Sequence, residues 1–422
     1  MAEFLIIQAA RFGDLVQTKR LLLSLATRGS VHLAADTGLI PLARRLFPFA
    51  KIHELAIHGQ PNATALEVNR KILSRWRHMC FDAVYNCNFS GLTTALCRIF
   101  PPETVYGYRP ENGGITRSPW ARLAFRLSTK RKFTPLNLVD FWAYFTDNPV
   151  PPASVNPSAK PGGRGIGIVL AGRESRRSLP IPVLAKLTQT AFGALNGPKV
   201  FLFGTKAEQP AARQLLRELP AKMFDRVHDL SGKTDLASLV DAVAGLDILL
   251  TPDTGIMHLA AHLGVPVQAF FLSSAWLHET GPYGEGHHVW QSTQQCAPCL
   301  ECAPCPYNVC CGVPFTEEKM LRILAHAMLH ASFNTPQQSL LPHKILPIPT
   351  GLQLWYTTTD TLGAKPVLLA GEDPHAAHRN AIRAFLAMHV HLPWKEHNVL
   401  PSNILEWLCH DADWMLPQGR YC

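Results

Sequence analysis

The chain has 422 residues, 47% of them hydrophobic and 17% charged, with a net charge of +9 and a pI near 9.0. This composition excludes a disordered chain, and the length predicts two domains with an appendage. The chain contains no apolar run of eighteen residues and no signal-peptide pattern at its start, so we expect a cytoplasmic protein without membrane spans. The basic charge favours anionic partners or serves solubility alone, and without a nucleic-acid-binding motif we expect no nucleic acid among them.

Apolar runs alternate with amphipathic stretches in the first half of the chain. A turn at 11–14 is expected to lead into one helix carrying Leu15, Leu22 and Leu25. This alternation predicts a parallel sheet wrapped by helices. The expected strands are residues 4–7, 31–35, 52–57, 81–86 and 104–108.

A proline-rich segment divides the chain. Residues 148–163 contain five prolines and a glycine pair, which indicates a semi-rigid linker between an N-terminal domain (1–147) and a second domain (164–333). Residues 334–422 form an extension to which the sequence assigns no role. After the linker the alternation of strands and helices resumes, which predicts an α/β fold of two Rossmann-like domains facing a central cleft. The strands expected there are residues 165–171, 199–203, 227–230, 247–251 and 265–271.

The segment DILLTPDTGIMHLAAHLGVP, residues 247–266, is the most informative part of the sequence. A buried strand ends before Asp253, and Asp253 or Thr254 can cap the helix that follows. Gly255 leaves room for a ligand near the backbone, and His258 lies one turn into the helix. The N-terminus of that helix would suit a diphosphate. A capped helix with a buried histidine is the alternative.

The longer stretch SGKTDLASLVDAVAGLDILLTPDTGIMHLAAHLGVPVQAFF resembles the signature of the bacterial heptosyltransferases, family 9 of the glycosyltransferases. LIIQAARFGDLVQT near the N-terminus is similar to the family's strand and Gly-Asp turn, and the resemblance extends over about residues 3–330. It implies a GT-B type fold and a metal-independent, inverting transfer from a nucleoside diphosphate sugar. We therefore expect a heptosyltransferase-like enzyme that uses ADP-heptose and a lipopolysaccharide core or related envelope saccharide. Another nucleotide sugar with a protein or capsule acceptor, and a non-catalytic metal-binding scaffold, are the alternatives.

The resemblance also implies roles for single residues. Asp14 matches the family's catalytic aspartate, with Gly13 beside it near the donor, although Asp14 could instead cap a helix. Arg177 takes the place of the family's diphosphate-binding lysine. Glu208 matches an acidic residue that binds the nucleotide, and it could equally be a glutamate favoured by a helix dipole.

Six cysteines lie between positions 296 and 311, in a spacing that resembles that of metal ligands. The thiolates of Cys296, Cys299, Cys302 and Cys305 would suit a structural zinc ion or an iron–sulfur cluster. Disulfides formed after oxidation, or packed free thiols, are the alternatives. No metal is expected to be required for catalysis.

Basic residues are frequent between positions 109 and 132. Family members hold phosphorylated sugars with such residues, which implies acceptor binding by Arg109, Arg117 and Arg122. A charged helix face is the ordinary explanation. If the residues are functional, the protein would contact the inner face of the cytoplasmic membrane peripherally, where its anionic acceptor is held.

Overall fold

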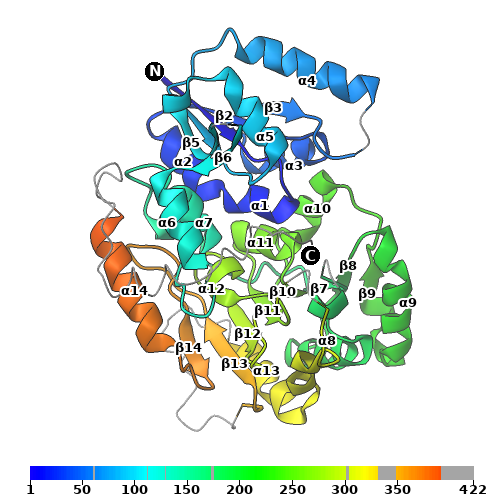
Figure 1. The fold of residues 1–422 in the computed structure, drawn as a ribbon. Coiled ribbons are helices and arrows are strands. Elements are labelled where there is room, and N and C mark those ends of the chain that lie inside the picture. The colour runs from blue at the N-terminus through cyan, green and yellow to red at the C-terminus, as the bar shows by residue number, and fades with distance from the viewer. Residues whose placement is uncertain are drawn as a thin grey trace. The chain divides into compact units, whose positions relative to one another are not determined.

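The computed structural model describes residues 1–59, 62–111, 113–128, 130–172, 175–300, 304–330 and 348–390. The chain forms two compact units, one built from Met1–Pro151 together with residues from His378 onward, and the other from Pro152–Ala377. Each unit contains a largely parallel sheet with helices, and together they confirm the predicted α/β fold of two Rossmann-like parts (Figure 1). Among the helices in the described ranges, none is both long and apolar enough to cross a membrane.

The first unit contains a six-stranded sheet in the order β3-β2-β1-β4-β5-β6, in which only β6 runs antiparallel to its neighbour. The expected helix after β1 is divided at Thr18, whose hydroxyl donates to Leu15 O at 2.6 Å. The elements are β1 (Ala2–Ile7), α1 (Phe12–Gln17), α2 (Lys19–Ala26), β2 (Gly29–Asp36), η1 (Thr37–Leu39), α3 (Ile40–Leu46), β3 (Lys51–Leu55), α4 (Ala63–Trp76), β4 (Ala83–Asn86), α5 (Gly91–Leu96), η2 (Cys97–Ile99), η3 (Pro102–Thr104), β5 (Val105–Glu111), β6 (Gly114–Arg117), α6 (Pro119–Ser128), α7 (Leu138–Ala143) and α14 (Ala376–His389).

A chain of hydrogen bonds runs through the core of the first unit. Trp76 Nε1 donates to His53 Nδ1 at 3.3 Å, so His53 carries its proton on Nε2 and donates to His32 Nδ1 at 2.7 Å. His32 Nε2 then donates to Glu3 Oε2 at 2.6 Å. Each buried imidazole is thus a neutral tautomer fixed by its two partners.

The second unit contains an eight-stranded sheet in the order β14-β13-β12-β11-β10-β7-β8-β9, parallel from β9 to β12. Residues 352–370, inside the segment expected to be an extension, add β13 and β14 antiparallel to this sheet. The elements are η4 (Pro152–Ser154), β7 (Ile166–Val169), η5 (Ser175–Arg177), α8 (Ile181–Ala194), β8 (Val200–Phe203), η6 (Lys206–Glu208), α9 (Gln209–Glu218), η7 (Ala221–Arg226), β9 (Val227–Asp229), α10 (Leu236–Val243), β10 (Ile248–Pro252), α11 (Gly255–His262), β11 (Val267–Phe271), α12 (Leu277–Thr280), β12 (His288–Ser292), η8 (Cys310–Thr316), α13 (Glu318–His330), β13 (Leu352–Tyr356) and β14 (Val367–Ala370).

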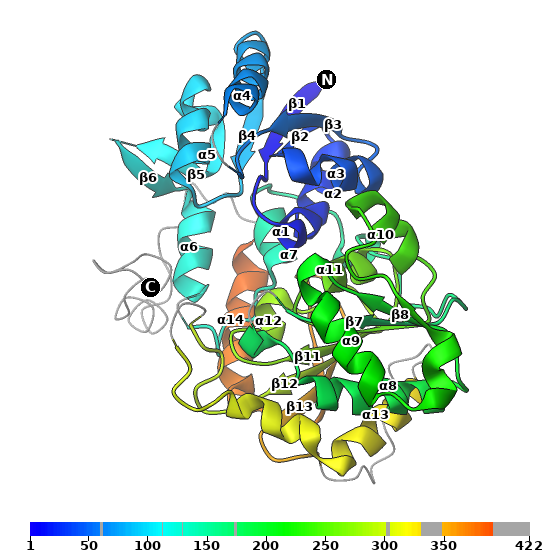
Figure 2. The same cartoon turned by 90° about the vertical axis from the view of Figure 1, so that its right-hand side faces the viewer.

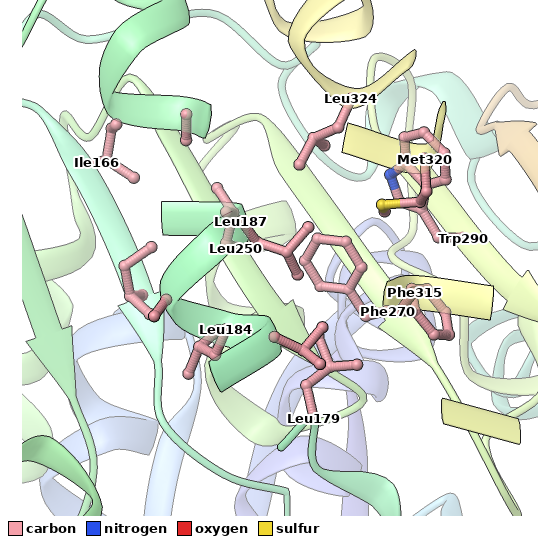
Figure 3. Close-up of a cluster of buried hydrophobic side chains, with 14 of the residues drawn as sticks. Ile166, Leu179, Leu184, Leu187, Leu250, Phe270, Trp290, Phe315, Met320 and Leu324 are labelled. Atoms are coloured by element: carbon pink, nitrogen blue, oxygen red, sulfur yellow. The ribbon is translucent and has the colours of Figure 1, made fainter. Parts of the chain in front are cut away.

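The core of the second unit lies between its sheet and two helices, α8 and α13, which pack side by side (Figures 1 and 2). Phe270 and Trp290 from the sheet meet Phe315 and Met320, and Leu250 belongs to the same cluster (Figure 3). Burial of each such side chain contributes about 1.5–3 kcal/mol. This core packs against the strands whose ends carry the candidate site.

The C-terminal part of the proline-rich linker is hydrogen-bonded to the second unit. The N–H groups of Ala159, Lys160 and Gly162 donate to backbone carbonyls of that unit at 2.9–3.1 Å. Gly162 passes so close to Gly245 that a Cβ atom on it would lie 2.2 Å from the Gly245 carbonyl oxygen. At its other end, Val150 N donates to Ser24 Oγ of the first unit at 2.9 Å.

Candidate functional site

The second unit has its topological switch point between β7 and β10. These parallel neighbours have crossover connections that leave in opposite directions, because β8 and β9 lie beyond β7 whereas β11 and β12 lie beyond β10. Ligands of such sheets bind outside the carboxyl ends of the strands at this point. The segment after β7 carries Arg177, and the turn after β10 carries Asp253.

The turn after β10 is a capped helix start, as predicted. Thr254 is the N-cap of α11, and its hydroxyl accepts from Met257 N at 3.4 Å. The Thr251 hydroxyl lies 3.2 Å from the Thr254 hydroxyl, and Gly255 is the first helical residue. The unsatisfied N–H groups and the dipole of a helix start favour an anion.

Asp253 is the centre of a polar network beside this helix start. Arg177 Nη2 donates to the Asp253 carboxylate and, at 3.1 Å, to its backbone carbonyl. The Thr280 hydroxyl donates to Asp253 Oδ2 at 2.9 Å, and His258 Nε2 lies 3.8 Å from Oδ1. The Asp253 and His258 side chains are each 7% exposed and that of Arg177 is 13% exposed, so this charge pair is largely removed from water.

His258 is a neutral member of this network at pH 7. Its pKa is lowered to about 4, chiefly by burial, with an opposing effect of Asp253 and a smaller lowering by the Arg177 cation. Burial disfavours the charged form of an imidazole, which explains the direction of the main effect. The structure therefore brings together five of the predicted site residues, namely Arg177, Asp253, Thr254, Gly255 and His258.

In the first unit, Asp14 follows β1, which lies at the switch point beside β4. Asp14 Oδ2 accepts from Arg11 N at 3.2 Å, as a residue that caps a helix does, and Gly13 precedes it within α1. Asn88, which follows β4, is hydrogen-bonded to the segment between β1 and α1. Its side chain accepts from Ala9 N at 3.1 Å and donates to Ile7 O at 2.8 Å. A half-buried carboxylate thus stands at the carboxyl edge of this sheet.

Glu208 caps its own helical turn. Its Oε2 accepts from the backbone N and the hydroxyl of Thr205, both at 2.6 Å. This is the second of the two interpretations that the sequence left open, and binding of the nucleotide by Glu208 remains a prediction.

The described cysteines of the cluster are free thiols. Cys296 is exposed, and Cys299 and Cys305 are half-buried. Within the described ranges, no three Cys, His, Asp or Glu side chains are grouped so that they could hold a metal ion. Cys302 lies outside those ranges, so the metal site remains a prediction.

The three predicted acceptor-binding arginines have different surroundings. Arg117 stacks over the ring of Phe125, 3.7 Å from its centroid. Arg117 is paired with Tyr108 across the β5–β6 ribbon, whereas Arg109 is paired with Thr116, so Arg109 and Arg117 lie on opposite faces. Arg122 is exposed on α6.

Sequence reasoning did not identify Thr280 or Asn88. Thr280 lies 27 residues after Asp253 in a helix of four residues, and no motif marks it apart from the Gly-Pro-Tyr that follows. Asn88 follows β4, so the end of a strand beside β1 was the available signal.

Comparison with known proteins finds a family match within the second unit. Residues 184–307 match the model of glycosyltransferase family 9 (heptosyltransferase). The chain is 33% identical over 76 residues to lipooligosaccharide heptosyltransferase 2 of Haemophilus influenzae, a match that covers 18% of this chain and 22% of that protein. The chain thus spans about a fifth of the length of this relative.

Solved structures share the fold over a larger part of the chain. The family 9 glycosyltransferase of Veillonella parvula is 14% identical, with a TM-score of 0.59 over 78% of this chain and 97% of that one. ADP-heptose lipopolysaccharide heptosyltransferase II of E. coli is 18% identical, with a TM-score of 0.53 over 68% and 90%. Over the matched region, residues 184–307, the second unit is thus similar to the heptosyltransferases of glycosyltransferase family 9.

Proposed function

We propose that the protein is an inverting, metal-independent glycosyltransferase that moves a heptose from ADP-heptose to a lipopolysaccharide core or related anionic saccharide. The observation that carries this proposal is the meeting of Arg177 with Asp253 at the capped start of α11, inside the switch point of the second unit. A cation and a helix N-terminus at one strand edge are what a departing diphosphate requires.

In this proposal Asp14 is the general base. The acceptor hydroxyl attacks the anomeric carbon of the donor and passes its proton to Asp14, while the bond to the diphosphate breaks and the nucleotide leaves with the electron pair. Arg177 and the N–H groups at the start of α11 stabilise the charge that develops on the diphosphate. Glu208 and His258 contact the nucleoside or the sugar, and Gly13 allows the donor to approach.

The acceptor side is proposed to lie on the first unit, in the cytoplasm at the inner face of the cytoplasmic membrane. Exposed Arg122 is the best placed of the three basic candidates to meet an anionic saccharide, because Arg117 is stacked on aromatic rings. Charge reversal at Arg122 is therefore expected to weaken acceptor binding and leave donor binding intact.

The first test is calorimetric titration with ADP, GDP and UDP without added metal. Micromolar binding of ADP alone supports the heptosyltransferase proposal. Preference for UDP or GDP would retain the transferase but discard ADP-heptose as its donor. No binding by the folded protein would favour a non-catalytic scaffold.

The role of Arg177 in diphosphate binding is tested by comparison with the neighbouring Arg176. Arg177→Met removes a charge-assisted contact of about 1.5–3 kcal/mol, so ADP should bind roughly tenfold to a hundredfold more weakly. Arg176→Met is the matched control, because Arg176 Nη2 donates to Leu300 O at 2.8 Å, away from Asp253. Equal losses in the two variants would contradict the assignment.

Asp14 is tested by the isosteric change Asp14→Asn. Loss of a general base should lower kcat by about 10²–10⁴-fold. The Kd for ADP should stay within about twofold, since the donor diphosphate is held by the second unit. Unchanged turnover would refute the role of Asp14 as base.

A further inference from the structure

The Asp253 network holds one anion and one cation in the ligand-free protein. Asp253 Oδ2 accepts from Arg177 and from the Thr280 hydroxyl, and Oδ1 faces His258 Nε2 at 3.8 Å. His258 is neutral at pH 7, because burial lowers its pKa to about 4. The pair Arg177–Asp253 is therefore balanced in charge before any ligand arrives.

A bound diphosphate would compete with Asp253 for Arg177. If the guanidinium moves to the phosphates, the neutral Thr280 hydroxyl is the one hydrogen-bond partner that the Asp253 carboxylate keeps among the described residues. An ionised carboxylate that is 7% exposed and has lost its cation is strongly destabilised. Uptake of a proton by a group beside Asp253 would restore a positively charged partner.

His258 is in position to supply it. The charged groups facing His258 are Asp253, from the turn after β10, and Arg177, from the segment after β7. α10 also packs against α11 and contains Asp241, and His262 lies one turn along α11 itself. When Arg177 moves to the diphosphate, repulsion on a protonated imidazole falls and the attraction of Asp253 remains.

We propose that binding of the donor diphosphate transfers Arg177 from Asp253 to the phosphates and is coupled to uptake of one proton from water by His258, which replaces Arg177 as the partner of Asp253. This inference rests on the proposed function, because it requires a diphosphate at Arg177. Departure of the nucleotide reverses the exchange and returns the proton to water.

The experiment is calorimetric titration of the full chain with ADP-heptose at pH 6.5 in PIPES and in imidazole, two buffers with different enthalpies of ionisation. The diphosphate of this ligand is esterified at both ends, so its own charge stays constant across the range. If the pKa of His258 in the complex returns to about 6.5, about half a proton per site is taken up, and binding is about tenfold tighter at pH 5.5 than at 7.5. Equal heats in the two buffers would overturn the proposal and indicate that Arg177 bridges both anions.

Two variants test whether His258 is the group that takes up the proton. His258→Gln keeps a hydrogen-bond donor but cannot be protonated, so it should bind ADP-heptose without proton uptake and with a flat pH dependence. His262→Gln, a change to a buried histidine on the same helix, should retain the uptake. Undiminished uptake in His258→Gln would refute His258 as the acceptor of the proton. If ADP-heptose does not bind the folded wild-type chain, the proposed donor is wrong and the coupling fails with it, an outcome distinct from binding without uptake.

Discussion

Acidification from pH 7 to pH 5 is expected to destabilise the first unit through His53. Burial lowers the pKa of His53 to about 4, with added repulsion from His32, whereas the ordinary value is 6.5. The unfolded chain therefore takes up a proton below pH 6.5 that the folded chain does not accept until about pH 4. Stability present above pH 6.5 is lost as the pH falls, and at pH 5 the loss from His53 is about 2 kcal/mol.

The structure suggests a variant that isolates this effect. His53→Gln offers an oxygen to Trp76 Nε1 and an N–H to His32 Nδ1, the two groups that His53 now contacts, but it cannot be protonated. Urea unfolding at pH 7 and pH 5, read by hydrogen exchange of peptides from β2 and β3, reports the first unit separately. The variant should lose about 2 kcal/mol less than wild type on acidification. The exposed His78→Gln variant should lose as much as wild type, and equal losses in all three proteins would refute the reasoning.

Two further predictions concern stability. Arg20 and Asp140 form a buried ion pair at 2.6 Å, with side chains 1% and 3% exposed. Arg20→Met should therefore lower the free energy of unfolding in urea by about 3–5 kcal/mol, because it leaves the Asp140 carboxylate buried without its cation. The double variant Arg20→Met/Asp140→Leu should recover part of that loss. Gly162→Ala should lower Tm, because its Cβ would lie 2.2 Å from Gly245 O. The control Gly193→Ala is exposed near the end of α8, where a Cβ would meet nothing within 4 Å, so it should leave Tm unchanged or raise it.

The sheet of each unit could be predicted from sequence where its strands are apolar runs followed by helices. The predicted strands 4–7 and 247–251 contain such runs, and residues 4–7 of β1 and 248–252 of β10 are buried in central strands. β12 was not predicted, because its sequence HVWQS contains polar residues that are nevertheless buried. Gln268 explains this: it accepts from Trp290 Nε1 at 2.8 Å, and its amide lies 3.2 Å from His288 Nδ1. Partners on a neighbouring strand are not visible in a local pattern.

The candidate site likewise contains features that could be predicted from sequence and features that could not. The helix start at Thr254 is a local feature, and its cap could be predicted from residues adjacent in sequence. The contact of Thr280 with Asp253 depends on how α12 returns to the end of β10, which no spacing encodes. Glu208 was open to two interpretations because a glutamate in the first turn of a helix is favoured by the helix dipole whether or not it binds a nucleotide, and its contact with Thr205 is seen only in the structure.

The return of α14 to the first unit has a consequence for synthesis on the ribosome. Arg379 of this helix donates to Lys132 O, and His378 packs against Phe133, so residues made after 377 complete a unit begun at residue 1. The second unit, by contrast, ends at Ala377. During translation the later unit is complete first, and the earlier unit must wait for its last helix while more than two hundred residues are added. A nascent chain stalled after β14 would thus contain a finished second unit and an unfinished first unit.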